Sequence, residues 1–239
     1  MIRINLISGP RNISTALMYA FAQRSDTLVL DEPYYATYLL SSGVHHPGRD
    51  DTIASLPHRE QDVDAHIFQD APGYKILFIK NMAHHIELLR EEIKEGLINV
   101  FLIRDPRQVI SSYSRVIEDP VMRDIGIEYQ HALFTRMMKA AGSPPFVIDS
   151  GLLLNDPESV LRQLCYRINI EFAPEMLSWP AGPKPYDGAW APWWYSNVHR
   201  SVGFAKPSGQ PEAVPDKLEA LCREATYYYE KLLPFAINP

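Results

Sequence analysis

The sequence is poor in the features that mark secreted, membrane-spanning and nucleic-acid-binding proteins. Of its 239 residues only two are cysteine, and no apolar run approaches the roughly 18 residues that span a bilayer. The first apolar run begins at residue 2, which leaves no room for a signal peptide. The formal net charge of −6 disfavours nucleic acid and anionic membranes as partners. We therefore expect a cytoplasmic protein without a membrane span.

The cysteines and the paired histidines also argue against a disulfide framework and a metal centre. Cys165 and Cys222 each lie on the apolar side of a helical pattern, so both are predicted to be buried free thiols. His45-His46 and His84-His85 lack the spacing of metal ligands and have no cysteine partner. We therefore expect no bound metal.

What the sequence does contain is an alternation of apolar strand patterns with helical ones. The strand patterns are Ile2–Ile7, Thr27–Leu30, Tyr74–Ile79, Ile98–Ile103 and Phe146–Ile148. This alternation predicts an α/β fold of three layers, α/β/α, around a central, mostly parallel five-stranded sheet. It predicts a single domain over residues 1–239.

Three segments carry more specific expectations. One helix is predicted to carry Ile93 and to end at Gly96. Another is predicted to begin with Asp105 as its N-cap and Pro106 in its first position, and Gln108 is expected to complete a capping box. Residues 41–66 lack periodicity and are expected to form a lid, a substrate loop or a disordered segment.

The first strand pattern ends abruptly at Ser8-Gly9-Pro10, and a helical pattern follows. The first-turn amides of such a helix and its dipole attract phosphate or sulfate. Arg11 adds a positive charge, and Ser14 and Thr15 add hydroxyl donors. The Gly-x-x-x-x-Gly-Lys-Ser/Thr loop of nucleoside triphosphatases is absent. The alternative interpretation is an ordinary strand-to-helix turn with a surface arginine.

Polar residues also follow the other strand patterns, and ligands of parallel sheets bind at the carboxyl ends of the strands. These residues are Asp31 and Glu32 after the second pattern, Lys80, Asn81, His84 and His85 after the third, Arg104, Ser111 and Ser112 after the fourth, and Asp149 and Ser150 after the fifth. We expect the functional site among them.

Two of these segments together resemble a known family. Pro10–Thr15 is similar to the 5′-phosphosulfate loop P-[KR]-[SC]-G-[ST]-[ST] of sulfotransferases that use 3′-phosphoadenylyl sulfate (PAPS), with Asn12-Ile13 in place of its Ser-Gly pair. Arg104 and Ser112 match the arginine and the serine of the family's 3′-phosphate motif, R-[ND]-P-[KR]-[DQ]-x-x-x-S-x-Y. The resemblance covers most of the chain. It implies the P-loop-type fold and transfer of a sulfuryl group from PAPS to a hydroxyl or amine of a small-molecule, lipid or carbohydrate acceptor, with adenosine 3′,5′-bisphosphate (PAP) as the product.

The resemblance implies which residues bind the nucleotide: Arg11, Asn12, Ile13, Ser14, Thr15, Arg104, Ser112 and Arg200. The backbone amides of the first loop, with its two hydroxyls, would hold the 5′-phosphate. Arg104 and Ser112 would hold the 3′-phosphate, and Arg200 would join them from a late basic loop. The tryptophan-rich residues 174–215 and residues 41–66 would flank the acceptor pocket. Alternatively, the tryptophans would simply pack around an irregular segment.

Sulfuryl transfer needs positive charge on the leaving oxygen and a base for the acceptor proton. Arg11 is expected to stabilise the leaving group, and Lys80 joins the expected catalytic set. Two bases compete. Glu32 is preferred, because its position after the second strand fits the family better than the looser spacing of His84 or His85. A histidine titrates near neutral pH, whereas burial must raise the pKa of Glu32.

Two other functions remain open at this point. Leu28–Leu30 followed by Asp31 and Glu32 resembles the strand that carries the magnesium-binding acids of an ATPase, which would indicate a metal-dependent phosphotransferase or kinase. The altered Asn12-Ile13 pair would also suit a non-catalytic nucleotide-binding protein on the same fold. The sulfotransferase hypothesis requires that Arg11 and Arg104 open onto the same crevice.

Overall fold

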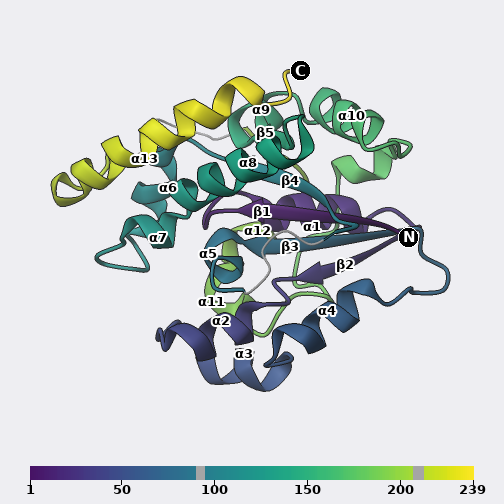
Figure 1. Cartoon of the computed structure of the whole chain (residues 1–239), viewed down its shortest axis with the longest axis horizontal. Helices are drawn as coiled ribbons and strands as arrows, with labels where there is room; N and C mark the ends of the chain where they lie inside the picture. Colours follow the sequence, from purple (N-terminus) through teal and green to yellow (C-terminus); the bar gives the residue numbers. More distant parts are fainter. Residues whose placement is uncertain (90–94, 207–212) are drawn as a thin grey trace.

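Five parallel strands form the centre of the protein in the computed structural model, which describes residues 1–89, 95–206 and 213–239. The strands are β1 (Ile2–Ser8), β2 (Thr27–Asp31), β3 (Ile76–Met82), β4 (Ile98–Ile103) and β5 (Phe146–Asp149). Their order across the sheet is β2-β3-β1-β4-β5, and every neighbouring pair is parallel. Figure 1 shows helices on both sides of this sheet. The predicted α/β/α fold is therefore confirmed.

The helices connect the strands and cover the sheet. Their bounds are α1 (Ser14–Ala22), α2 (Tyr35–Ser42), α3 (Arg49–Ser55), α4 (Glu60–Phe68), α5 (Ala83–Ile86), α6 (Pro106–Tyr113), α7 (Met122–Ile125), α8 (Ile127–Ala141), α9 (Ser150–Asn155), α10 (Pro157–Arg167), α11 (Ala191–Trp194), α12 (Ser196–His199) and α13 (Glu219–Leu232). Three short 3₁₀ helices are η1 (Pro174–Leu177), η2 (Asp216–Leu218) and η3 (Leu233–Phe235).

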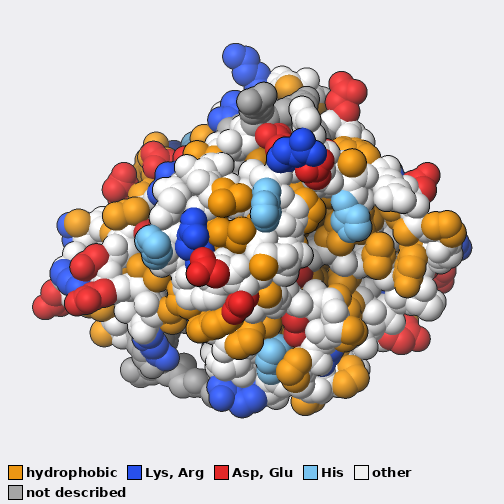
Figure 2. Space-filling view, turned by 90° about the horizontal axis from the view of Figure 1, so that it is seen from below, with side chains coloured by type: hydrophobic (Ala, Val, Ile, Leu, Met, Phe, Trp, Pro, Cys, Tyr) orange, Lys and Arg blue, Asp and Glu red, His pale blue; other side chains and the backbone are white. Residues whose placement is uncertain are grey.

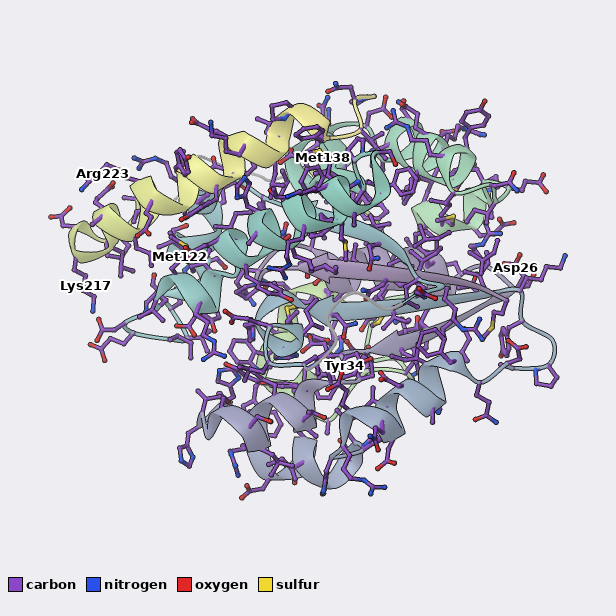
Figure 3. All side chains as sticks on the ribbon, in the orientation of Figure 1. Asp26, Tyr34, Met122, Met138, Lys217 and Arg223 are labelled. Atoms are coloured by element: carbon purple, nitrogen blue, oxygen red, sulfur yellow. The ribbon has the colours of Figure 1, made fainter. Side chains whose placement is uncertain are left out.

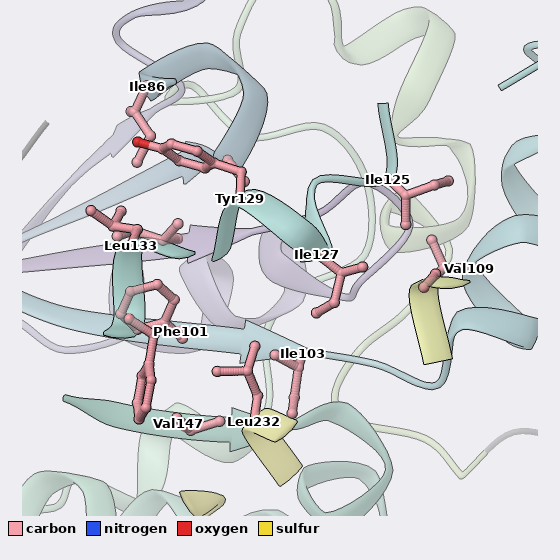
Figure 4. Close-up of a cluster of buried hydrophobic side chains, with 14 of the residues drawn as sticks. Ile86, Phe101, Ile103, Val109, Ile125, Ile127, Tyr129, Leu133, Val147 and Leu232 are labelled. Atoms are coloured by element: carbon pink, nitrogen blue, oxygen red, sulfur yellow. The ribbon is translucent and has the colours of Figure 1, made fainter. Parts of the chain in front are cut away.

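Alternate side chains of each strand enter two different cores, because successive residues of a strand face opposite sides of the sheet. Val100 and Leu102 of β4 pack in the core under α1 and α10. Phe101 and Ile103 pack in the core under α8 and α13, where Figure 4 shows Phe101 near Leu133 of α8 and Ile103 near Leu232 of α13. From Val100 to Ile103 both faces of β4 are buried, which explains the apolar sequence of this part of the strand.

Residues 41–66 are more ordered than their sequence suggests. They contain α3 and most of α4, so the alternative of a disordered segment is wrong, whereas a lid or substrate segment stays a prediction. Each of these helices buries only one side chain per turn or fewer, such as Thr52 in α3 and Val63 in α4, which leaves little periodicity to detect. The hydroxyl of Tyr34 donates to Asp64 of α4 at 2.5 Å and ties this helix to the segment after β2. Figure 3 shows Tyr34 between the sheet and the helices α2, α3 and α4.

The helix α6 begins where the sequence predicts, but one predicted contact at its start is not formed. Asp105 caps the helix by accepting a hydrogen bond from the amide of Arg107, and Pro106 is its first residue. The predicted capping box is wrong, because the Gln108 side chain accepts from Arg104 instead. The predicted position of Ile93 lies outside the described residues.

The remaining bulk expectations concern thiols and the surface. Cys165 and Cys222 are buried free thiols, as predicted. No helix among the described residues has the length and hydrophobicity needed to cross a bilayer. On the side where α3 and α4 lie, acidic and basic side chains are interspersed (Figure 2).

Candidate active site

A cavity of about 360 Å³ opens at the carboxyl ends of the strands. Arg11, Glu32, Lys80 and Arg104 all line it, and each comes from the end of a different strand. Because the strands are parallel, their carboxyl ends meet at one edge of the sheet. Arg11 and Arg104 therefore share one cavity, as the sulfotransferase hypothesis requires.

The loop between β1 and α1 has an unusual backbone. Arg11 and Ile13 adopt left-handed conformations, with φ of 56° and 52°. The amide of Leu17 makes the first hydrogen bond of α1, to the carbonyl of Ile13. The preceding amides have no partner within the helix and are available to an anion. The loop has the form of an anion-binding turn, and the hydroxyl-bearing Ser14 and Thr15 line the same cavity.

The Asn12 side chain anchors this loop to the sheet rather than facing a ligand. Its Nδ2 donates to the carbonyl of Leu102 in β4 at 2.6 Å. Its Oδ1 accepts from the hydroxyl of Ser150, which also lies 2.8 Å from the carbonyl of Ile103. The side chain is buried, so the backbone of Asn12 is the part left for nucleotide binding.

Two arginines give one half of the cavity a positive charge. Arg11 Nε donates to Ser112 Oγ at 2.9 Å, and Arg104 Nη1 donates to the carbonyl of Arg11 at 2.8 Å. Burial lowers the pKa of both guanidinium groups, and Arg11 lowers that of Arg104 further. Both stay charged, because an arginine is effectively always protonated. Neither forms an ion pair with a described residue, so their charges remain available to an anion.

Arg200 is the predicted nucleotide ligand that the structure does not bring to this cavity. Its side chain is exposed and donates to Asn197 at 2.6 Å. Val198, Ser201 and Gly203 from the same segment line the cavity instead. The predicted contact of Arg200 with the 3′-phosphate is not supported by this placement.

Glu32 and Lys80 form a buried charged centre beside the arginines. Lys80 Nζ donates to Glu32 Oε1 at 2.6 Å, to Asp31 Oδ1 at 2.7 Å and to the hydroxyl of Tyr195 at 2.5 Å. Burial raises the pKa of Glu32 to about 7, against the lowering effect of Lys80. Burial lowers the pKa of Lys80, but Asp31 and Glu32 more than offset it, so its pKa is raised. Glu32 thus combines an ionisation near neutral pH with a fixed position.

Both histidines after β3 are buried and line the cavity as uncharged rings. Burial lowers the pKa of His84 to about 3, with help from His46, and lowers that of His85 well below its ordinary value. The ring of His85 stacks on Tyr35 at 4.2 Å between centroids. Its Nδ1 lies 3.6 Å from Glu32 Oε2. A base with a pKa near 3 accepts a proton poorly at neutral pH. The geometry and the pKa directions therefore favour Glu32.

Sequence reasoning did not single out Tyr195, although it completes the charged centre. Its hydroxyl accepts from Lys80 and from Trp190 Nε1 and donates to Asp31. It comes from the tryptophan-rich segment, far along the chain from Asp31. In the sequence, only its position in this aromatic cluster could have pointed to Tyr195.

A doubly covered parallel sheet with an anion-binding loop after its central strand defines the general class of P-loop-like α/β proteins. Residues 2–234 match the sulfotransferase domain family. The chain belongs to this family, which confirms the resemblance seen in the two phosphate motifs.

Solved sulfotransferases share the fold. The sulfotransferase domain of the Synechococcus PCC 7002 olefin synthase superposes with a TM-score of 0.55 at 18% identity, covering 94% of each chain. The sulfotransferase domain from the curacin biosynthetic pathway gives 0.52 at 17% identity, covering 99% of this chain and 98% of the other. A sulfotransferase from Alicyclobacillus acidocaldarius gives 0.56 at 12% identity, covering 98% and 96%. At these identities the likeness concerns the fold alone.

Two curated relatives come from Arabidopsis thaliana. "Branched-chain-amino-acid aminotransferase-like protein 1" is 37% identical over 209 residues, which are 87% of this chain and 37% of the relative. "Branched-chain-amino-acid aminotransferase-like protein 2" is 37% identical over 214 residues, 89% of this chain and 38% of the relative. The chain thus spans less than two fifths of the length of these relatives.

Proposed function

We propose that this protein transfers a sulfuryl group from PAPS to a hydroxyl or amine of a small-molecule, lipid or carbohydrate acceptor. The observation that carries the proposal is the shared cavity. Arg11 and Arg104, without acidic partners among the described residues, lie in the same cavity as the buried carboxylate of Glu32. The two guanidinium groups suit the two phosphates of a bis-phosphorylated nucleotide. The carboxylate can take the proton that the acceptor loses.

The proposed reaction is a single in-line displacement at sulfur. The hydroxyl oxygen or amine nitrogen of the acceptor forms a bond to sulfur while the bond from sulfur to the 5′-phosphate oxygen breaks. Glu32 takes the acceptor proton. Arg11 and the loop amides stabilise the negative charge that develops on the phosphate of PAP, and Arg104 with Ser112 holds the 3′-phosphate. Lys80 holds the Glu32 carboxylate in place.

The phosphotransferase alternative fits the acidic residues less well. Asp31 and Glu32 are the acids that it would use for magnesium. In the structure the ammonium of Lys80 lies between them, at 2.7 and 2.6 Å. A divalent cation would have to displace this buried ammonium and lie beside its charge.

The nucleotide assignment is tested by thermal unfolding with PAP, and in parallel with ATP and Mg²⁺. A ligand that binds the folded state stabilises it by about 2.7 kcal/mol at one hundred times its Kd. We expect PAP to raise Tm and Arg104→Ala to remove most of the shift. Arg107→Ala is the matched control, because Arg107 is exposed and pairs with Glu219 on the surface.

Three outcomes would contradict parts of this proposal. No shift with millimolar PAP would refute the nucleotide assignment, and a larger shift with ATP and Mg²⁺ would favour the phosphotransferase. Binding of PAP without sulfate transfer from PAPS to any of a broad set of acceptors would favour a non-catalytic nucleotide-binding protein.

A further inference from the structure

Two buried amide side chains join the loop after β1 to the ends of the neighbouring strands. The first belongs to Gln130 of α8, of which only 1% is exposed. One orientation of its carboxamide gives both of its polar atoms a partner. In that orientation Oε1 accepts from the amide of Gly9 at 3.1 Å, and Nε2 donates to the carbonyls of Ile7 at 3.3 Å and Leu102 at 3.2 Å. Gln130 therefore connects the carboxyl ends of β1 and β4.

The second amide side chain, that of Asn12, shares the carbonyl of Leu102. Asn12 Nδ2 donates to this carbonyl at 2.6 Å, and Asn12 Oδ1 accepts from the hydroxyl of Ser150, a fully buried residue directly after β5. The resembling motif has serine or cysteine in place of Asn12. Asparagine is longer and carries its donor and its acceptor on separate atoms, so it can hold both partners at once. The loop is thus tied to β4 and β5 together.

The same contacts connect the loop with the second arginine of the site. The shared carbonyl of Leu102 lies two residues before Arg104, and Arg104 Nη1 donates to the carbonyl of Arg11 at 2.8 Å. A second, small cavity of about 10 Å³ is lined by Asn12, Arg104 and Gln130 among others, so these three side chains lie around one point. One network therefore holds both arginine-bearing segments.

The loop needs such support because its own backbone is strained. Arg11 and Ile13, on either side of Asn12, adopt left-handed conformations with φ of 56° and 52°. A side chain with a Cβ disfavours this conformation, which persists only where the surroundings impose it. A loop released from the network would relax and would move its amides relative to Arg104.

We infer that Gln130 and Ser150 are positioning residues that fix the separation of two phosphate subsites, one at the loop and one at Arg104. This inference rests on the proposed function, in which one nucleotide bridges both subsites. Neither residue lines the main cavity, so each acts through the loop or through Asn12. Two linked phosphates bind more tightly than one only while the subsites match their separation. The network therefore favours a bis-phosphorylated nucleotide over a mono-phosphorylated one.

Calorimetry with the full chain measures the Kd of PAP, of adenosine 5′-phosphate and of adenosine 3′-phosphate. Each mono-phosphate fills only one phosphate subsite, so the quantity compared is its Kd divided by the Kd of PAP. Gln130→Met keeps the length of the side chain and removes the carboxamide, and we expect it to lower this ratio roughly tenfold. A merely structural role would weaken the binding of all three nucleotides by the same factor and leave the ratio unchanged.

Ser150→Ala tests the other end of the network, because it removes the hydroxyl that Asn12 accepts from. We expect it to lower the ratio roughly fivefold, the effect of one lost hydrogen bond. Gln163→Met is the matched control, because Gln163 of α10 lines neither cavity and donates to the carbonyl of Asn238. The Tm of each variant without nucleotide shows whether it is folded.

The outcomes separate this inference from the proposed function. If the unchanged protein binds PAP no more tightly than the mono-phosphates, the proposed nucleotide assignment fails, and the inference fails with it. If PAP is preferred, the proposed function stands. The inference is then overturned if Gln130→Met or Ser150→Ala keeps the ratio of the unchanged protein, or if Gln163→Met lowers it as much. Should Gln130→Met not fold, Ser150→Ala decides alone, because it opens the same network.

Discussion

At the scale of single residues, the site depends on how burial treats different ionisable groups. A carboxylate beside a buried ammonium is pulled in two directions, and for Glu32 burial prevails enough to bring its pKa to about 7. The neighbouring His84 is driven the other way, to about 3. The two groups that competed as catalytic base are thus separated by their surroundings rather than by their intrinsic chemistry.

Glu32→Gln should reduce kcat at least about a hundredfold, because general base catalysis contributes about 10²–10⁴-fold, while the Tm shift with PAP remains. In the unchanged protein the ionised form of Glu32 is the active one. The rate should therefore fall as pH drops below about 7 and reach a plateau above it. Steady-state kinetics between pH 5.5 and 8.5 measure both effects.

Glu158→Gln is the control, because Glu158 is an exposed residue of α10 that pairs with Arg162. A flat pH profile, or full activity of Glu32→Gln, would remove Glu32 from its proposed role and return His84 and His85 as candidates.

At the scale of elements, the turn between β1 and α1 combines a strained backbone with a firm anchor. Ile13 is β-branched, and it adopts φ 52° and ψ 16° as the N-cap of α1. The resembling motif has glycine at this position, which takes up that conformation without steric cost. The Asn12 bonds to Leu102 and Ser150 hold the turn in place despite the strain.

Ile13→Gly should be more stable to urea than Ile13→Ala by about 1 kcal/mol. Both variants lose the isoleucine side chain, but alanine keeps the Cβ that makes a left-handed backbone costly by about 1–2 kcal/mol. This order is the reverse of the one found inside helices, where alanine is favoured by about 1 kcal/mol. If the alanine variant proves equal or more stable, the backbone of this turn differs from the one described.

At the scale of the whole molecule, the tryptophan-rich segment packs against the carboxyl end of β2, the strand at one edge of the sheet. Tyr195 bonds to Lys80 and Asp31, and the amide of Gly188 donates to Asp31 Oδ2 at 3.0 Å. Tyr19 of α1 donates to Asp187 Oδ1 at 2.6 Å. These contacts join the late segment to β2, β3 and α1, so the charged centre also contributes to the assembly of the fold.

Tyr195→Phe should lower the free energy of unfolding by about 2 kcal/mol, because Lys80, Asp31 and Trp190 each lose a buried hydrogen-bond partner. It should also lower kcat, since Lys80 and Glu32 are no longer held in place. Urea unfolding followed by fluorescence measures the first effect. Tyr227→Phe, at a 56% exposed position of α13, is the control. A loss no larger than that of the control would show that the Tyr195 hydroxyl is not needed to hold the segment.

The structure confirms some expectations because they rest on local patterns. The apolar strand β4 and the cap and proline at the start of α6 follow from neighbouring residues. Two others depart from expectation because a side chain has several possible partners, and the partner it takes is only three or four residues away. Gln108 would have capped its own helix, but the guanidinium of Arg104 is a stronger donor and takes its side chain. Arg200, which the resemblance places at the nucleotide, donates instead to Asn197 on the surface.

By itself the sequence determined the parallel α/β architecture and the two motifs that resemble those of sulfotransferases, because strand and helix periods and turn chemistry are properties of adjacent residues. The tertiary structure alone decided that Arg11 and Arg104 share a cavity, that burial brings the pKa of Glu32 to about 7, and that Tyr195 joins the charged centre. Burial and partner distance depend on segments far apart in the chain, and no local pattern encodes them.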